Sequence, residues 1–261
     1  LKPLINNKII RPWNANYVEI KNKVVIKREK WNYDTKHYVG YPKMSSVAKF
    51  ISKDSVIKFS CKIVRIYKKS DGWYLYDSDK IFYGPYDWIV CTMPPKQAIE
   101  LLPLNFKYFD IIKNIKMRSC FSLMLGFNKN KEIKYDAALF KEDDLQWVSS
   151  NKTYENNNSF TNILINSSYD FAEKNIDSSI NTISNYLVQK ASENTNVDLT
   201  DFKHKALHFW RYAMSDNRNK FGSFIDEELK IIVCGDWCIN GNVESAFLSA
   251  KNAAHNLLKN F

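Results

Sequence analysis

The chain has 261 residues, of which 45% are hydrophobic and 15% aromatic, so it can bury one large core or the cores of two modest domains. The net charge is +10, but the lysines are scattered among Asn, Asp and Glu, so a nucleic-acid partner is not expected. No apolar run approaches the roughly 20 residues that span a bilayer, and no secretory signal is visible. We therefore expect a cytoplasmic protein with no membrane partner.

The cysteines indicate a reducing compartment. They are odd in number, mostly far apart and set in apolar, strand-like surroundings: Cys61, Cys91, Cys120, Cys234 and Cys238. This pattern favours buried reduced thiols over a disulfide framework. The last two flank a Gly-Asp-Trp sequence, but their spacing is not Cys-x-x-Cys, so packing is favoured over redox chemistry.

The first part of the chain is expected to be extended and then to form a short helix. Residues 23–30, KVVIKREK, read as a strand with one solvated face. After the turn at Gly40 and Pro42, Ser45 or Ser46 can cap a helix, whose apolar positions are Val47, Ala48, Phe50 and Ile51.

A series of strands follows up to residue 93. The sequences CKIVRIYK and GWYLYD alternate around Ser70-Asp71-Gly72, which predicts a hairpin. The nearly continuous apolar run YDWIVCTM predicts a strand buried on both faces. It stops at Pro94-Pro95, and KQAIELL begins a helix whose first position tolerates proline.

The middle of the chain predicts three strands, SCFSLMLGF, LQWVSSN and SFTNILIN, with YENNNS as the loop between the last two. A helical region over 167–194 follows, in which Ile180, Ile183, Tyr186 and Leu187 recur at helical spacing. The next segment, KHKALHFWRYAM, is expected to be extended. Its His204 and His208 share one strand face, but no third ligand is evident, so no metal site is predicted.

The C-terminal segment, IIVCGDWCINGNVESAFLSAKNAAHNLL, is the main candidate site. A buried strand ends at Gly235, where the missing Cβ would let backbone approach a ligand, and Asp236 can accept hydrogen bonds from hydroxyl groups. A helix is expected from Val243. Its free first-turn amides attract phosphate or the electron-rich edge of a cofactor. Its expected buried positions are Ala246, Phe247, Ala250, Ala253, Ala254, Leu257 and Leu258. From these residues alone, a plain strand–loop–helix remains an equal alternative.

Three blocks of sequence resemble FAD-dependent enzymes of the amine-oxidase type, particularly the renalase-like NAD(P)/FAD-dependent oxidoreductases. The first block runs from HYVGYPKMSSVAKFIS through CKIVRIYKKSDGWYL to GPYDWIVCTMPPKQAIELL. The second is the C-terminal segment, which supplies Gly-Asp-Trp and then Glu-Ser-Ala before an alanine-rich helix. The third is HFWRYA at 208–213. The resemblance is good over 37–103 and 206–261 and loose between them.

The resemblance implies positions for an FAD cofactor. Gly235 and Asp236 would lie at its ribityl and phosphate region, and backbone amides near Asn242, Val243 and Glu244 would lie beside the flavin ring. The strand CKIVRI resembles one whose backbone pairs with the adenine, through Ile63 or its neighbour Lys62. Arg211 is a candidate cation near flavin or substrate, with a structural salt bridge as the alternative. No catalytic residue is assigned.

The sequence departs from the family pattern in three ways. Lys43 and Ala250 stand where the family usually has glycine. The Gly-x-Gly-x-x-Gly unit that holds the FAD pyrophosphate is not found in these 261 residues. The chain could be a fragment, a second polypeptide could supply the unit, or FAD binding could be lost. Because the sequence begins with Leu1 and not with methionine, we favour a fragment.

These observations together predict a mixed α/β (α+β) fold, in which a Rossmann-like FAD/NAD(P)-binding domain is interleaved with a sheet-rich substrate domain. The resemblance assigns 43–93 and 230–261 to the FAD domain, and 1–42 and 94–229 to the substrate domain. We expect an FAD-dependent oxidoreductase that oxidises an amine or a reduced nicotinamide-like small molecule by hydride transfer to flavin. The alternative is a non-catalytic binding or accessory protein that retains a flavoprotein scaffold.

Overall fold

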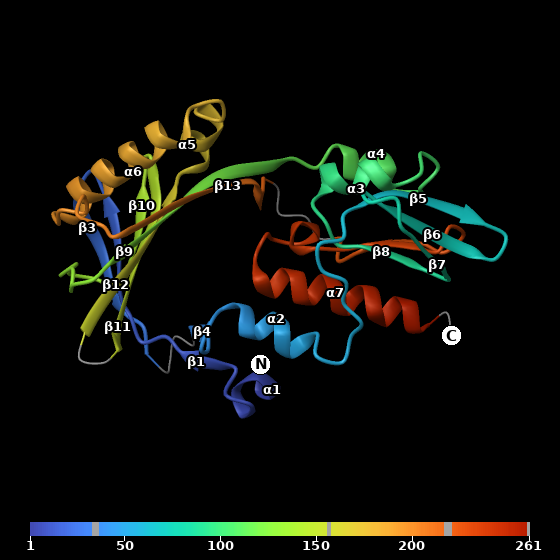
Figure 1. Ribbon diagram of the computed structural model, residues 1–261, viewed down its shortest axis with the longest axis horizontal. Coiled ribbons are helices and arrows are strands. Elements are labelled where there is room, and N and C mark those ends of the chain that lie inside the picture. Colours follow the sequence, from blue (N-terminus) through green and yellow to red (C-terminus); the bar gives the residue numbers. More distant parts are fainter. Residues whose placement is uncertain (33–36, 156–157, 217–220, 260–261) are drawn as a thin grey trace. The chain divides into compact units, whose positions relative to one another are not determined.

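The structure, a computed structural model, describes residues 1–32, 37–155, 158–216 and 221–259. The chain forms two compact units, each built from two separate segments (Figure 1). Unit 1 comprises residues 1–56 and 120–210, and unit 2 comprises residues 57–119 and 211–261. This is the mixed α/β (α+β) class expected from the sequence.

The boundaries of the compact units differ from those expected for the domains. Residues 43–56 lie in unit 1, whereas 94–119 and 211–229 lie in unit 2. The reason is packing. Ala98, Leu102 and Ile112, which follow the expected boundary at 93, are buried in one cluster with Ile231 and Val233.

Unit 1 is built on a mixed sheet with the strand order β13-β9-β12-β11-β10-β2-β3. The pair β10–β2 is parallel, while β2–β3, β10–β11, β11–β12 and β12–β9 are antiparallel. The strand bounds are β2 (Asn16–Lys21), β3 (Val24–Lys30), β9 (Met117–Phe127), β10 (Ala137–Lys141), β11 (Leu145–Glu155), β12 (Asn158–Ser167) and β13 (His204–Ser215). The strands predicted in the middle of the chain are therefore confirmed, but β11 and β12 extend into the segment expected to be a loop, of which 156–157 lie outside the described residues.

Two helices, α5 (Tyr169–Lys174) and α6 (Ile180–Thr195), lie along one face of this sheet (Figure 1). Their inward side chains join the sheet in the largest core cluster. Ile183 and Leu187 are 1% and 0% exposed, as the helical spacing predicts, whereas Ile180 is 68% exposed and Tyr186 is only partly covered. The helix starts are set by Ser168 and Ser179, whose side chains accept hydrogen bonds from backbone amides one turn later.

The N-terminal part of unit 1 adds α1 (Lys2–Asn6) and a small sheet of β1 (Ile10–Pro12) and β4 (Tyr38–Gly40), followed by α2 (Ser45–Ile51). The helix α2 is where the sequence predicts it, but the expected serine cap is wrong. Met44 is already helical at the N-cap position, and its sulfur accepts a hydrogen bond from the Gly40 amide at 3.0 Å.

An ion-pair cluster closes the end of unit 1 beside β13. Asp201 forms ion pairs with Lys129 and Lys131, and Lys131 is 7% exposed. Hydrogen bonds from these two lysines hold the pKa of the Asp201 carboxyl down at about 2.

Unit 2 contains two small sheets. One has the order β14-β15-β8, with β15 and β8 parallel, and the other has the antiparallel order β5-β6-β7. Their bounds are β5 (Ile63–Lys69), β6 (Gly72–Asp77), β7 (Phe82–Tyr86), β8 (Ile89–Cys91), β14 (Phe224–Asp226) and β15 (Ile231–Val233). The helices are α3 (Pro95–Leu101), α4 (Phe109–Lys113) and α7 (Val243–Leu258). The predicted hairpin is confirmed, because Lys69 pairs with Gly72 across its turn.

The strand β8 corrects one expectation. The apolar run predicts a strand buried on both faces, but only Ile89–Cys91 is a strand, and its middle residue Val90 is 48% exposed. Side chains of a strand alternate between its two faces, so one face of β8 packs in the core and the other is open. Among the described residues β15 is the strand that pairs with β8.

The packing of α7 corrects a second expectation. Its fully buried residues are Ser245, Ser249 and Ala253, whereas Phe247 is 61% and Leu258 72% exposed. Of the positions expected to be buried, Ala253 is buried, and Ala246 and Leu257 are half-buried. The remaining four are exposed: Phe247, Ala250, Ala254 and Leu258. Small side chains let the helix approach the sheet closely, and the hydroxyl of Ser249 has hydrogen-bond partners that make its burial favourable.

Candidate functional site

The turn after β15 is fixed by a buried tryptophan. The indole of Trp237 is 1% exposed and donates from Nε1 to the carbonyl of Met93 at 3.2 Å. A Cβ built on Gly235 would lie 2.7 Å from this Nε1. The Gly235 backbone is extended (φ 167°), so its conformation alone does not require glycine. The sequence-based reason for this glycine, close approach to a ligand, is therefore incomplete, because the neighbouring indole already requires it.

The backbone amide of Gly235 is held from α7. Ser249 accepts a hydrogen bond from this amide at 3.0 Å and donates to the carbonyl of Gly222. Ser249 is fully buried. The sequence analysis assigns Ser249 no role, and a serine on the apolar face of an alanine-rich helix is the signal that could have revealed it.

Asp236 begins a short 3₁₀ turn, Asp236–Cys238, between the strand and α7. Its backbone carbonyl accepts hydrogen bonds from the amides of Ile239, Asn240 and Gly241 at 3.0–3.1 Å. The side chain is half-buried, and within the described ranges no group hydrogen-bonds to its carboxylate. The carboxylate can therefore accept hydrogen bonds from a ligand, whereas the backbone carbonyl is already used.

The helix α7 begins at Val243, as expected. Asn242 is its N-cap, with the side-chain oxygen accepting from the Ser245 amide at 2.8 Å. Val243 and Glu244 lie between the cap residue and Ser245, at exposed positions. Their backbone amides have no intrahelical acceptor. They carry the positive end of the helix dipole. The cap thus uses the side chain of Asn242 and leaves the next two amides open to a ligand.

Ile63 lines a small apolar cavity of about 250 Å³ in the same unit. Val90 and Cys91 of β8 line it as well. Because Cys91 pairs with Val233, this cavity adjoins the strand that leads into Gly235. The structure thus brings Ile63 to the sheet that carries the Gly-Asp turn. Ligands of parallel sheets bind at the carboxyl ends of the strands, where β8 and β15 both end.

Lys62 precedes β5 and is exposed, and its carbonyl accepts a hydrogen bond from the Ser78 amide at 2.9 Å. The strand β5 lies at the edge of the order β5-β6-β7. An edge strand turns alternate backbone groups away from its neighbour, so β5 has groups that can pair with a planar ligand.

The cysteines near the turn are buried thiols. Burial raises the pKa of Cys91 and of Cys238 to about 12. They therefore stay protonated at neutral pH and pack as small apolar side chains, as the sequence favours. Cys120 and Cys234 are also buried and Cys61 is half-buried, and all five are free. Arg211 lies exposed on β13, outside the Gly-Asp turn.

Residues 18–258 match the family described as flavin containing amine oxidoreductase, and the chain belongs to this family. Wild-type putrescine oxidase bound to putrescine has a similar fold, with a TM-score of 0.61 and 9% identity, over 85% of this chain and 54% of that chain. A double mutant of putrescine oxidase gives a TM-score of 0.60, 8% identity and the same coverage. Cyclohexylamine oxidase from Brevibacterium oxydans is similar with a TM-score of 0.56 and 12% identity, over 81% of this chain and 51% of that chain. The chain thus spans about half the length of these solved structures.

The cofactor of this family is FAD, and the described residues fit it. A half-buried carboxylate at Asp236 has no protein partner within the described ranges, two helix-start amides are open, and an apolar cavity adjoins β8. These features suit the ribityl hydroxyls, an electron-rich ring edge and a flat apolar ring, respectively. Among the described residues, no helix is long and apolar enough to cross a membrane.

Proposed function

We propose that the protein is an FAD-dependent oxidoreductase of the renalase-like type, which oxidises an amine or a reduced nicotinamide-like small molecule. Bound FAD supplies the acceptor for a hydride from the substrate. The observation that carries the proposal is the family match over residues 18–258, which includes the Gly-Asp turn and α7.

We propose the following roles for the residues of unit 2. Asp236 accepts hydrogen bonds from the ribityl hydroxyls, and Gly235 keeps the turn in place against Trp237. The cap by Asn242 directs the amides of Val243 and Glu244 toward the flavin ring. The backbone of Ile63 or of its neighbour Lys62 pairs with the adenine. We further propose that residues 1–42 and 94–229 belong to the substrate domain.

The first experiment tests cofactor binding. FAD is titrated into the protein, and quenching of flavin fluorescence gives the dissociation constant. Asp236→Ala removes a charge-assisted hydrogen bond worth about 1.5–3 kcal/mol and should weaken binding by about one to two powers of ten. Asp87→Ala, an exposed aspartate outside the turn, is the matched control and should bind like wild type. Equal affinity of Asp236→Ala and wild type would contradict the assigned role.

The second experiment tests the chemistry. The FAD-loaded protein is mixed anaerobically with a primary amine or with a dihydronicotinamide, and loss of the oxidised flavin absorbance is recorded. Reduction by either class supports the proposal and identifies the class. Uptake of FAD without reduction by either class would favour the non-catalytic alternative.

A further inference from the structure

Unit 1 contains a cavity of about 940 Å³ that the sequence does not reveal. One wall is the sheet face opposite α5 and α6. There Met124 and Leu164 alternate with core residues, and His204 adds a side chain from β13. The other wall comes from 11–14 and 39–44, the segments around β1 and β4. All of the lining residues belong to unit 1. The cavity is thus formed by four strands of the sheet and the N-terminal segments of one compact unit.

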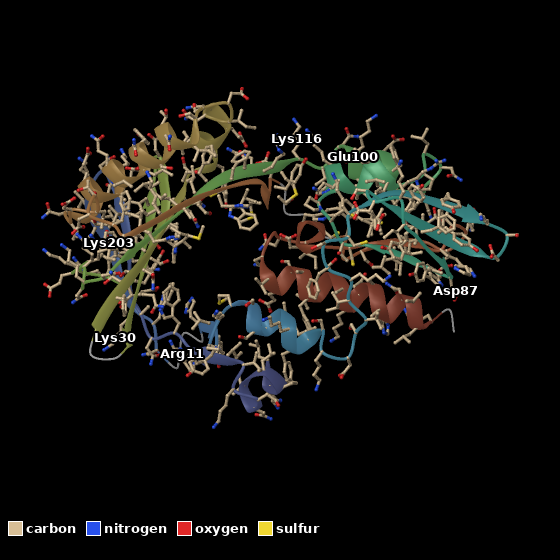
Figure 2. The ribbon with its side chains drawn as sticks, in the orientation of Figure 1. Arg11, Lys30, Asp87, Glu100, Lys116 and Lys203 are labelled. Atoms are coloured by element: carbon tan, nitrogen blue, oxygen red, sulfur yellow. The ribbon has the colours of Figure 1, made fainter. Side chains whose placement is uncertain are left out.

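The charged side chains in the described lining are basic. Arg11 and Lys43 are exposed and line the cavity, and none of the lining residues that the structure describes is an Asp or Glu. The guanidinium of Arg11 lies over the ring of Tyr41, 5.0 Å from its centre, which orients the cation without neutralising it (Figure 2 labels Arg11). Within the described ranges neither residue forms an ion pair with a carboxylate. The described part of the lining therefore carries positive charge that no described carboxylate neutralises.

The neutral polar side chains of the lining are also available. Ser149 and Asn151 come from β11 and Asn162 from β12, and these three and His204 make no side-chain hydrogen bond to another described residue. Gly126 lies between Asn162 and His204. A Cβ there would lie 3.2 Å from the Cβ of His204 and 3.7 Å from the amide oxygen of Asn162. The absent side chain keeps this part of the cavity open between two hydrogen-bonding groups.

We propose that this cavity binds a small molecule through an anionic group, a carboxylate or a phosphate, held by Arg11 and Lys43. The amides of Asn151 and Asn162 and the imidazole of His204 hydrogen-bond its remaining polar groups. The two cations attract an anionic group at the end of the ligand, whereas they repel an ammonium group there. If the ligand is the substrate of the oxidoreductase, this inference rests on the proposed function. It then specifies an anionic or zwitterionic substrate and disfavours a diamine.

The test compares primary amines of similar length that differ at the other end. Putrescine, butylamine and 4-aminobutanoate end in an ammonium, a methyl and a carboxylate, and 3-aminopropyl phosphate replaces the carboxylate by a phosphate. Binding is measured by isothermal titration calorimetry, without turnover. One of the two anionic probes should bind at least about tenfold more tightly than butylamine, and putrescine should bind most weakly. The tighter of the two anionic probes identifies the group. Equal or tighter binding of putrescine, or no binding of any probe, would overturn the proposal.

Charge variants test whether the preference for an anionic probe comes from the basic residues of this cavity. Arg11→Gln and Lys43→Gln should each reduce the affinity for the preferred anionic probe about tenfold and leave butylamine unchanged. Lys30→Gln, at an exposed site on β3 outside the lining, is the matched control and should keep the wild-type preference. Unchanged affinities in both cavity variants, with native circular dichroism, would refute the assignment. Because no readout involves flavin, a protein that fails to reduce FAD can still pass this test, so the two proposals fail separately.

Discussion

Gly235→Ala tests whether this glycine serves the neighbouring tryptophan or only a ligand. The added Cβ would lie 2.7 Å from Nε1 and 3.0 Å from Cδ1 of Trp237, closer than van der Waals contact allows. The indole cannot move freely, because it is 1% exposed and hydrogen-bonded to Met93. Overpacking of this kind costs about 1–3 kcal/mol, so the free energy of unfolding should fall by that amount.

Urea unfolding followed by circular dichroism measures the loss, and a double-mutant cycle with Trp237→Phe assigns it. Phenylalanine lacks Nε1, the nearest atom, so Gly235→Ala should cost less in the Trp237→Phe background than in wild type. A Gly235→Ala variant as stable as wild type would refute the packing argument. If that variant also lost FAD binding, the glycine would serve only the ligand.

Three further predictions concern residues outside the direct ligand contacts. Ser249→Ala removes two buried hydrogen bonds and leaves the Gly235 amide without its acceptor, so urea unfolding should show a loss of about 1–3 kcal/mol. Asn242→Ala removes the N-cap of α7 and should cost about 1 kcal/mol in the same assay. A loss below about 0.5 kcal/mol, as for a neutral surface substitution, would contradict the capping role. The folded-state pKa of Asp201 lies near 2, below its ordinary value of 3.8, so its stabilisation is fully present above pH 4 and is lost as the pH falls toward 2. Asp201→Asn should flatten this part of the stability–pH curve, whereas Asp87→Asn should leave it unchanged.

Local sequence was sufficient where neighbouring residues decide the structure. The Ser70-Asp71-Gly72 turn specifies the β5–β6 hairpin, because a two-residue connection fixes the register of the strands it joins. Pro95 begins α3 where the sequence places it. The start of α7 at Val243 follows from the cap residue before it. The positions of the Gly-Asp turn and of the helix-start amides could therefore be predicted in order along the chain, although their contacts could not.

Contacts between distant residues decided the rest. Apolar spacing on α7 predicts Phe247 as a buried residue, but Ser249 is buried because a carbonyl and an amide from other segments satisfy its hydroxyl. Val90 is 48% exposed in an apolar strand because the elements that pack on each face of β8, and not its composition, determine which side chains are covered. The basic cavity is the clearest case. Its Arg11 and His204 are far apart in sequence, and only the folding of the sheet brings them to one cavity. Sequence by itself determined the order of the elements and the family. The tertiary structure determined which side chains meet, because burial and charge depend on neighbours that the chain order does not specify.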